Sequence, residues 1–166
     1  MDYGLSFYTI IHNPTFTIQY PKKTYCLTTP QFAPNMYDLI SMLMADEVIW
    51  LDEAGWSRKG RSHRSRITNG EESVWIRVPV LSEDRSKAIN KVRIDQRKKW
   101  TKIMLKKIES MYSRHTFYDY FEAELSALIQ DGRDFELLID WNSYFFDQIL
   151  SFMELTLALK LQSLEA

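Results

Sequence analysis

The sequence predicts a single α/β domain, residues 1–166, with a small mixed sheet and three or four helices; an α+β arrangement is the alternative. The chain has 166 residues, of which 45% are hydrophobic and 14% aromatic, enough to fill one core. Residues 25–51 have the pattern of a strand, a helix and a second strand, which is typical of a βαβ unit with parallel strands. The apolar spacing after residue 96 is helical, so we expect the C-terminal third to be all-helical.

The first strands are expected near the N-terminus. Residues 7–20 are rich in aromatic and β-branched residues and are interrupted by His12-Asn13-Pro14, which predicts an additional hairpin within residues 1–23. The βαβ unit follows, with a buried strand at Tyr25–Leu27, a helix at Met36–Met44 and a second buried strand at Val48–Leu51 that ends at Asp52.

Asn69-Gly70 marks the clearest local signal, a β-hairpin. Ser62–Thr68 and Ser73–Val80 flank this pair, and the second segment alternates apolar and polar residues, so that one face is apolar. Asn-Gly is the preferred pair for a tight turn because both central residues need positive φ. After a polar loop we expect a further short strand at Lys91–Ile94.

Helices are predicted from Gln96 onward. Apolar residues between Trp100 and Tyr112 recur at helical spacing and leave a lysine-rich exterior, and Phe117–Ile129 forms a second helix. Asn142 or Ser143 is expected to cap a final helix that reaches Leu164. Because this last helix is apolar nearly all round, it is either deeply buried or packed on another chain, and a homo-oligomer formed through it is one expectation.

Composition argues against several classes of function. The single cysteine, Cys26, fits a reducing compartment, and the three histidines have no metal-ligand spacing. The sequence contains no Walker loop, dinucleotide-binding glycine motif or serine elbow. Its N-terminus lacks the pattern of a signal peptide, and no apolar run approaches the roughly 20 residues that cross a bilayer. We therefore expect a cytoplasmic protein without a metal site, a cofactor or membrane insertion.

Charge is segregated along the chain, although the net charge is only −1. Residues 54–116 carry 17 basic and 6 acidic side chains, whereas residues 117–166 carry 2 basic and 10 acidic ones. Either the two regions neutralise each other within the fold, or the basic region forms a cationic face for an anionic ligand. The sequence alone leaves both arrangements open.

The candidate binding residues form a run of cations after the second buried strand. Arg58, Lys59, Arg61, Arg64 and Arg66 lie within nine positions, and no acid intervenes between Glu53 and Glu71. Guanidinium groups suit phosphate because their planar fork donates two parallel hydrogen bonds. A solvated basic loop is the alternative.

Two further residues complete the candidate site. Asp52 lies at the expected carboxyl end of a buried strand, where ligands of open α/β sheets gather, and is the candidate catalytic group. Pairing of Asp52 with an arginine of the following loop is the alternative. Trp56 supplies an aromatic ring that stacks on a base or a sugar in this interpretation.

A series of short motifs is arranged in a distinctive order along the chain. They are Thr28–Pro34, Ala45–Asp52, Trp56, Arg64–Ile67, Asn69-Gly70, Val78–Val80, Ile89–Asp95, Trp100, Ile108–Tyr112 and Asp140–Asn142. Their order and spacing resemble those of the WbqC-like protein family from about Tyr25 to about Phe152. Thr28-Thr29 stands where many relatives have a His-Gln pair, and Ser62-His63-Arg64 stands where the family has an Arg-Asn-Arg run. We therefore expect a divergent member that is short at its C-terminus.

This resemblance implies a role in surface-polysaccharide (O-antigen) or sugar-nucleotide metabolism but implies no defined reaction. The leading hypothesis is an enzyme or ligand-binding domain for a phosphorylated small molecule such as a nucleotide-linked sugar. A non-catalytic interaction or dimerisation protein is the alternative. Nucleic-acid binding ranks third, because the acidic final third would repel a polyanion. If the absent His is catalytic in relatives, this chain is inactive or uses another group.

Overall fold

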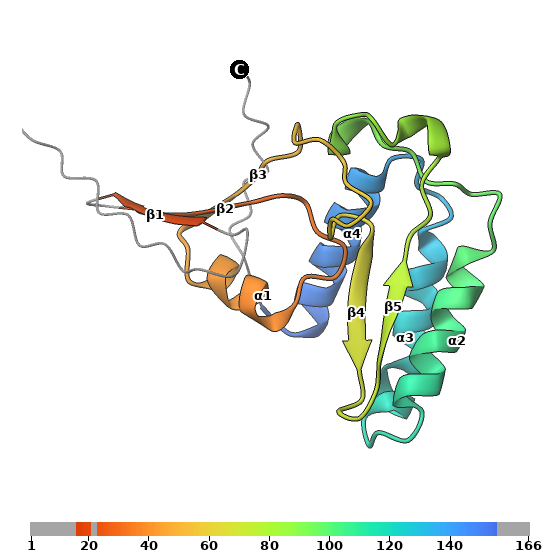
Figure 1. Cartoon of the computed structure of the whole chain (residues 1–166). Coiled ribbons are helices and arrows are strands. Elements are labelled where there is room, and N and C mark those ends of the chain that lie inside the picture. The colour runs from red at the N-terminus through yellow and green to blue at the C-terminus, as the bar shows by residue number, and fades with distance from the viewer. Residues whose placement is uncertain (1–15, 21–22, 156–166) are drawn as a thin grey trace, which may run out of the picture.

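The computed structural model describes residues 16–20 and 23–155. The elements follow in the order β1 (Phe16–Tyr20), β2 (Lys23–Thr28), α1 (Met36–Leu43), β3 (Glu47–Trp50), β4 (Arg64–Thr68), β5 (Ser73–Arg77), α2 (Trp100–Tyr112), α3 (Tyr118–Asp131) and α4 (Leu138–Phe152). Two short 3-10 helices, η1 (Ser82–Asp84) and η2 (Ile89–Lys91), lie between β5 and α2. The mixed α/β content and the helical C-terminal region confirm the predicted fold class (Figure 1).

The N-terminal part of the structure contains the predicted βαβ unit. β2 and β3 pair in parallel, with Cys26 opposite Val48, and α1 connects them. β1 adds to β2 in antiparallel orientation, which makes a mixed three-stranded sheet. Of the N-terminal hairpin predicted from the sequence, only Phe16–Tyr20 is described, and its expected turn at His12–Pro14 lies outside the described residues.

Helix α1 begins where a side chain replaces a missing backbone acceptor. The Asn35 side chain accepts a hydrogen bond from the Asp38 backbone N–H at 3.0 Å, as an N-cap residue does. Leu39 and Met42 then face inward and are buried against the sheet residues Val48 and Trp50. This packing holds α1 against one face of the three-stranded sheet (Figure 1).

β4 and β5 form the predicted hairpin in a sheet of their own, but its loop differs from the expected tight turn. The register pairs Thr68 with Ser73, which leaves four residues in the loop. Gly70 alone among them has positive φ (97°), and the Asn69 side chain accepts hydrogen bonds from the backbone N–H groups of Glu71 and Glu72. Asn69 therefore shapes the loop through its side chain rather than through a left-handed backbone.

The strand predicted at Lys91–Ile94 is wrong. Residues 89–91 form η2, and single bridges join Val80 to Ile94 and Arg93 to Leu137. On one side the Ile94 N–H donates to the Glu136 carbonyl, and the Leu138 N–H donates to the Val92 carbonyl. On the other side the Leu81 N–H donates to the Arg93 carbonyl. Because the bridge on each side is isolated and is not followed by further pairs, no continuous ladder forms.

Helix α4 begins at Leu138 and ends at Phe152, so the predicted start near Asn142 is wrong, and the predicted end at Leu164 lies outside the described residues. Asn142 lies inside the helix, 1% exposed, and its side chain donates a hydrogen bond to the Ser62 carbonyl at 2.8 Å. This long-range bond takes the side chain away from the capping role that the local sequence suggests.

The apolar core consists of two clusters that share α4. The larger one lies among the β4–β5 hairpin, α2, α3 and the first half of α4, which contributes Trp141 and Phe145. The smaller one fills the βαβ unit and receives Phe146 and Leu150 from the second half of α4. Figure 1 shows α4 between α1 and the hairpin. As far as Leu150, burial on both sides within this chain accounts for the apolar character of the helix.

Candidate functional site

Asp52 lies just after β3, at the carboxyl end of the parallel strand pair, as predicted. Its side chain is largely buried, and its backbone carbonyl accepts a hydrogen bond from the Asn90 N–H at 3.0 Å. The Asn90 side-chain amide also donates to the Asp52 carboxylate, at 3.5 Å. Asp52 lines none of the three cavities described below. Its predicted catalytic role stays a prediction.

Three of the four predicted arginines line one small cavity and are held there by neighbours. Arg61 pairs with the buried carboxylate of Asp38 at 2.5 Å. The guanidinium of Arg64 lies 4.3 Å from the centre of the Trp75 ring and donates to the carbonyls of Lys59 and Gly60. The Arg66 guanidinium donates to the Ser73 hydroxyl, at 2.7 Å from Nε. Because these three side chains already have acceptors or a ring face, a ligand would compete with internal partners.

We call this space the polar cavity; it measures about 180 Å³ and faces the Gln31–Asn35 loop. Gln31 is 2% exposed and donates to the Thr28 hydroxyl, while its Oε1 has no hydrogen-bond partner in the described part of the chain. Ala33 has φ of 47°, a left-handed conformation that costs a non-glycine residue about 1–2 kcal/mol. The loop thus carries strain next to a buried, unsatisfied acceptor.

Trp56 and Arg58 lie elsewhere, in a second cavity of about 390 Å³ that we call the cationic pocket. One wall is the first part of α2, where Trp100, Ile103, Met104 and Lys107 share a helix face at spacings of three and four. The opposite wall is the end of β5 and the segment after it. The complete lining is Trp56, Arg58, His63, Ile76, Arg77, Val78, Pro79, Val80, Arg85, Lys98, Trp100, Ile103, Met104 and Lys107.

The charge in the cationic pocket has one sign. Its lining contains five Arg and Lys side chains and no acid. Among the described residues, no ion pair involves Arg58, Arg77 or Arg85. Lys98 Nζ lies 3.6 Å from the Asp95 carboxylate, which also pairs with Arg97. Lys107 Nζ donates to the Trp75 carbonyl at 2.7 Å. Within the described part of the chain, the pocket therefore gathers positive charge that ion pairs compensate only in part, and such a field favours anions in general.

The ion pairs show which acids balance the positive charge of the basic region, residues 54–116. None of the ion pairs within residues 16–20 and 23–155 joins a cation of residues 54–116 to an acid beyond residue 116. The basic region is instead balanced in part by its own acids, Asp84 and Asp95, and by Asp38. As far as residue 155, direct ion pairs with the acidic C-terminal region do not neutralise it.

The loop that carries Arg85 is anchored by the neighbouring Asp84. The Asp84 carboxylate is fully buried and accepts hydrogen bonds from the Arg93 backbone N–H at 3.0 Å and from Arg93 Nε at 2.8 Å. Lys87 Nζ lies 2.5 Å from the same carboxylate. These contacts, led by the Arg93 hydrogen bond, hold the pKa of Asp84 well below its usual range. Asp84 thus stays ionised and fixes the loop that presents Arg85 to the pocket.

His63 is the buried polar group of the cationic pocket. Its ring is 7% exposed and lies 4.8 Å from the Trp56 ring, centre to centre. Nδ1 has no hydrogen-bond partner among the described residues. Burial, followed by repulsion from Arg64, Arg77 and Arg85, lowers the pKa of His63 to about 4. The imidazole is therefore neutral at pH 7.

Sequence reasoning missed His63, Arg77, Arg85, Lys98 and Lys107 as members of one site. These residues come from four segments that are separated in sequence, whereas the members of the basic run of residues 58–66 are close in sequence. The hairpin separates that run, because His63 lines the cationic pocket while Arg64 and Arg66 line the polar cavity. The alternation of side chains along β4 was the signal available for His63.

A third, apolar cavity of about 400 Å³ lies on the side of the hairpin that faces α1, α3 and α4. Aliphatic and aromatic side chains form nearly all of its lining, including Phe121, Leu125 and Ile149. Phe117, at its edge, and Tyr120, in the same turn of the chain, are both more than 70% exposed. Exposed aromatics beside an apolar cavity are typical of a surface that meets another apolar molecule.

Residues 16–20 and 23–155 contain neither a metal-binding cluster nor a membrane-spanning helix. No group of three or more His, Cys, Asp or Glu side chains in these ranges is arranged to hold a metal ion. Within the same ranges, no helix is both long enough and apolar enough to span a membrane.

The fold and the site together define a mixed α/β protein with a cationic pocket beside a β-hairpin. The chain belongs to the WbqC-like protein family, whose model matches residues 29–165. This match begins close to where the sequence motifs predicted and continues past Phe152. No curated protein and no solved structure matches the chain.

Proposed function

We propose that this protein binds a phosphorylated small molecule, such as a nucleotide-linked sugar, in the cationic pocket, and that it does so in the cytoplasm as part of surface-polysaccharide biosynthesis. The observation that carries the proposal is the lining of the pocket, which contains five cations and no acid. The family resemblance supports the biosynthetic setting by analogy.

The parts of such a ligand match the parts of the pocket. Arg58, Arg77 and Arg85 have no ion pair within the described chain, so their guanidinium groups are available to phosphate oxygens. Trp56 presents an indole ring, on which a base or a sugar stacks. The volume of about 390 Å³ is in the range of small-molecule sites.

Whether the protein is an enzyme or a binding domain turns on Asp52. The carboxylate lies outside the pocket lining, so direct contact with a bound ligand requires the ligand or the chain around Asn90 to extend toward it. Asp52→Asn keeps the shape of the side chain and removes its negative charge. Unchanged ligand affinity with loss of any turnover would support a catalytic role, and unchanged turnover would remove Asp52 from the mechanism.

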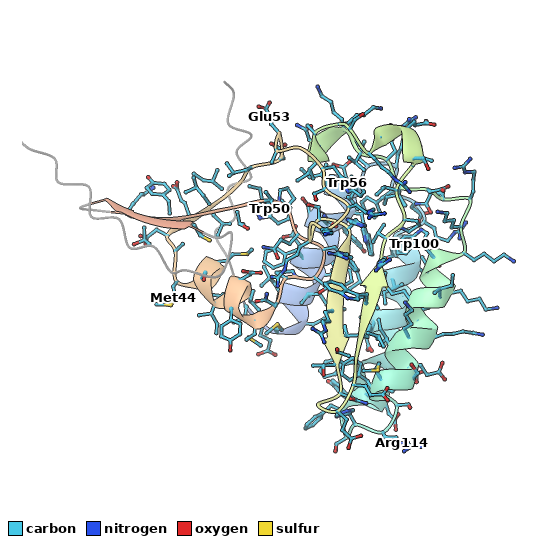
Figure 2. All side chains as sticks on the ribbon, in the orientation of Figure 1. Met44, Trp50, Glu53, Trp56, Trp100 and Arg114 are labelled. Carbon is cyan, nitrogen blue, oxygen red and sulfur yellow. The ribbon has the colours of Figure 1, made fainter. Side chains whose placement is uncertain are left out.

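Binding is tested by isothermal titration calorimetry with UDP-glucose and with inorganic pyrophosphate. The double variant Arg77→Gln/Arg85→Gln removes two unpaired cations, and we expect it to weaken binding by at least about tenfold, since each charge-assisted hydrogen bond contributes about 1.5–3 kcal/mol. The matched control is Arg114→Gln, because Arg114 is exposed and lies beyond the opposite end of the hairpin from Trp56 and Trp100 (Figure 2). Equal affinities of the double variant and the control would exclude the pocket.

The same titration at several salt concentrations separates the small ligand from a nucleic acid. Binding of a polyanion weakens steeply with salt because many counterions are released. Tight binding of single-stranded RNA with a steep salt slope, together with no response to UDP-glucose, would replace the proposal by nucleic-acid binding.

The apolar cavity favours a second candidate, a non-catalytic interaction protein that self-associates. Phe117 and Tyr120 are the exposed side chains that such contact would cover. Light scattering of the wild-type protein and of Phe117→Ser/Tyr120→Ser tests it. A dimer that dissociates in the double variant supports this candidate, and a monomer in both cases removes it.

A further inference from the structure

The polar side chains of the cationic pocket are almost all hydrogen-bond donors. Its Arg and Lys side chains and the indoles of Trp56 and Trp100 donate and have no acceptor atom. The remaining lining side chains are aliphatic or proline, apart from the weakly accepting thioether of Met104. His63 is the one lining side chain whose nitrogen lone pair makes it a strong acceptor, and protonation would turn it into a donor as well.

Positively charged side chains also surround His63, and they come from each segment that packs against it. Arg64 follows it in the chain, Arg77 comes from β5, Arg85 from the loop after η1, and Arg58 from the segment before it. Lys98 and Lys107 face the same pocket from the start of α2. The contact with Trp56 and the 7% exposure keep water from solvating an added charge.

We propose that His63 senses ligand charge: its imidazole is neutral while the cationic pocket is empty and takes up a proton when a ligand with two negative charges binds. This inference rests on the proposed function, because it needs an anion in the pocket. It assigns to His63 a role in specificity, since the bound proton strengthens the complex with a doubly charged ligand more than that with a singly charged one.

The physical basis is a change in the charge near the imidazole ring, from positive in the free protein to negative when a dianion is bound. In the free protein, burial, followed by repulsion from three arginines, lowers the pKa of His63 to about 4. A bound dianion compensates the arginines and attracts the protonated ring, so the pKa rises in the complex. Protonation then lets both ring nitrogens donate, including Nδ1, which has no partner among the described residues of the free protein.

Linkage makes the effect measurable. A proton taken up on binding makes the affinity rise as the pH falls, by up to tenfold for each unit by which the pKa increases. UDP-glucose is a suitable probe because each of its phosphates has one ester link and one anhydride link, so each carries a single negative charge that stays fixed across this range. We expect its dissociation constant to be about three- to tenfold lower at pH 5.5 than at pH 7.5.

The experiment is titration calorimetry with UDP-glucose at several pH values, in pairs of buffers that differ in ionisation enthalpy. The difference between paired buffers gives the number of protons taken up. Wild-type protein should take up a fraction of one proton, and His63→Asn, which places the residue of the family's Arg-Asn-Arg run at this position, should bind with no uptake. His115→Asn is the matched control, because His115 is exposed and distant in sequence, and its uptake should equal that of the wild type.

The outcomes separate this inference from the proposed function. Binding without proton uptake in the wild type, or equal uptake in wild type and His63→Asn, would overturn the role of His63 and leave the pocket assignment intact. Absence of UDP-glucose binding would overturn both. NMR of the imidazole resonances in the wild type at pH 5.5 gives an answer that does not depend on folding of a variant. His63 must be neutral when free and shift toward the protonated form on saturation, and an imidazole that stays neutral would refute the inference.

Discussion

Gly132→Ala tests the packing that supports the cationic pocket. Gly132 follows α3 with φ of −57°, so its backbone does not require glycine, but an added Cβ would lie 2.5 Å from Cη2 and 2.9 Å from Cζ2 of Trp100. Carbon atoms in contact are normally about 3.5–4.0 Å apart, so the indole must move by about 1 Å. Trp100 is buried and donates from Nε1 to Gln96 Oε1, and Gln96 Nε2 in turn donates to the Gly132 carbonyl.

Overpacking of this kind costs about 1–3 kcal/mol. For a domain of this size each kcal/mol lowers the melting temperature by about 2–4 °C. Because Trp100 also lines the cationic pocket, the same variant should weaken UDP-glucose binding. Urea unfolding followed by tryptophan fluorescence gives the free energy of unfolding, and calorimetry gives the affinity.

The control is Gly55→Ala, because no atom lies within 4 Å of a Cβ built at Gly55. We expect Gly55→Ala to leave the free energy of unfolding unchanged or to raise it by up to about 1 kcal/mol, since alanine reduces the freedom of the unfolded chain. If Gly132→Ala unfolds with a free energy within about 0.5 kcal/mol of that of Gly55→Ala, the close approach of Gly132 to Trp100 is not a constraint and the reasoning is refuted.

Three further predictions concern buried polar groups. Asn142→Ala should lower the free energy of unfolding by about 1–3 kcal/mol in urea titration, because the buried Ser62 carbonyl loses its donor; no loss would mean that water replaces the amide. Cys26 should react with Ellman's reagent only after unfolding, because burial and then Asp38 raise the pKa of its thiol to about 11, and fast labelling of the native protein would contradict this. For His63, the folded pKa of about 4 lies below its ordinary 6.5, so the unfolded chain binds the proton first as the pH falls. The wild type should therefore lose up to about 3 kcal/mol of stability between pH 6.5 and 4, and His63→Asn should lose less; parallel profiles for the two would contradict a neutral, buried ring.

The fold was predictable where the signal is local. The βαβ unit and the β4–β5 hairpin follow from apolar runs and alternation within about a dozen residues. The errors occur where contacts with residues far away in the sequence determine the local structure. Asn142 has the residue type of a helix cap but bonds to Ser62. Residues 91–94 have the composition of a strand but meet Val80 and Leu137 only through isolated bridges.

The site was less predictable than the fold for a related reason. The sequence indicated that residues 54–116 form a cationic region, and Trp56 and Arg58 do lie together in a cationic pocket. Nearness in sequence, however, grouped Arg58 with Arg64 and Arg66, whereas the hairpin places Arg64 and Arg66 in another cavity. Arg77 and Arg85 join Arg58 only through tertiary packing, which no motif in a single sequence reports.

The sharing of α4 between two apolar clusters has a consequence for how the protein is made. The βαβ unit, with Cys26, Val48 and Trp50, is translated early. Phe146 and Leu150, which complete its apolar cluster, are translated later as part of α4. At about 5–20 residues per second, the ribosome needs roughly 5–20 s to reach them. During that time the nascent chain exposes the apolar surface of the incomplete cluster. Chaperones that recognise apolar surfaces can bind there until α4 emerges from the ribosome and covers it.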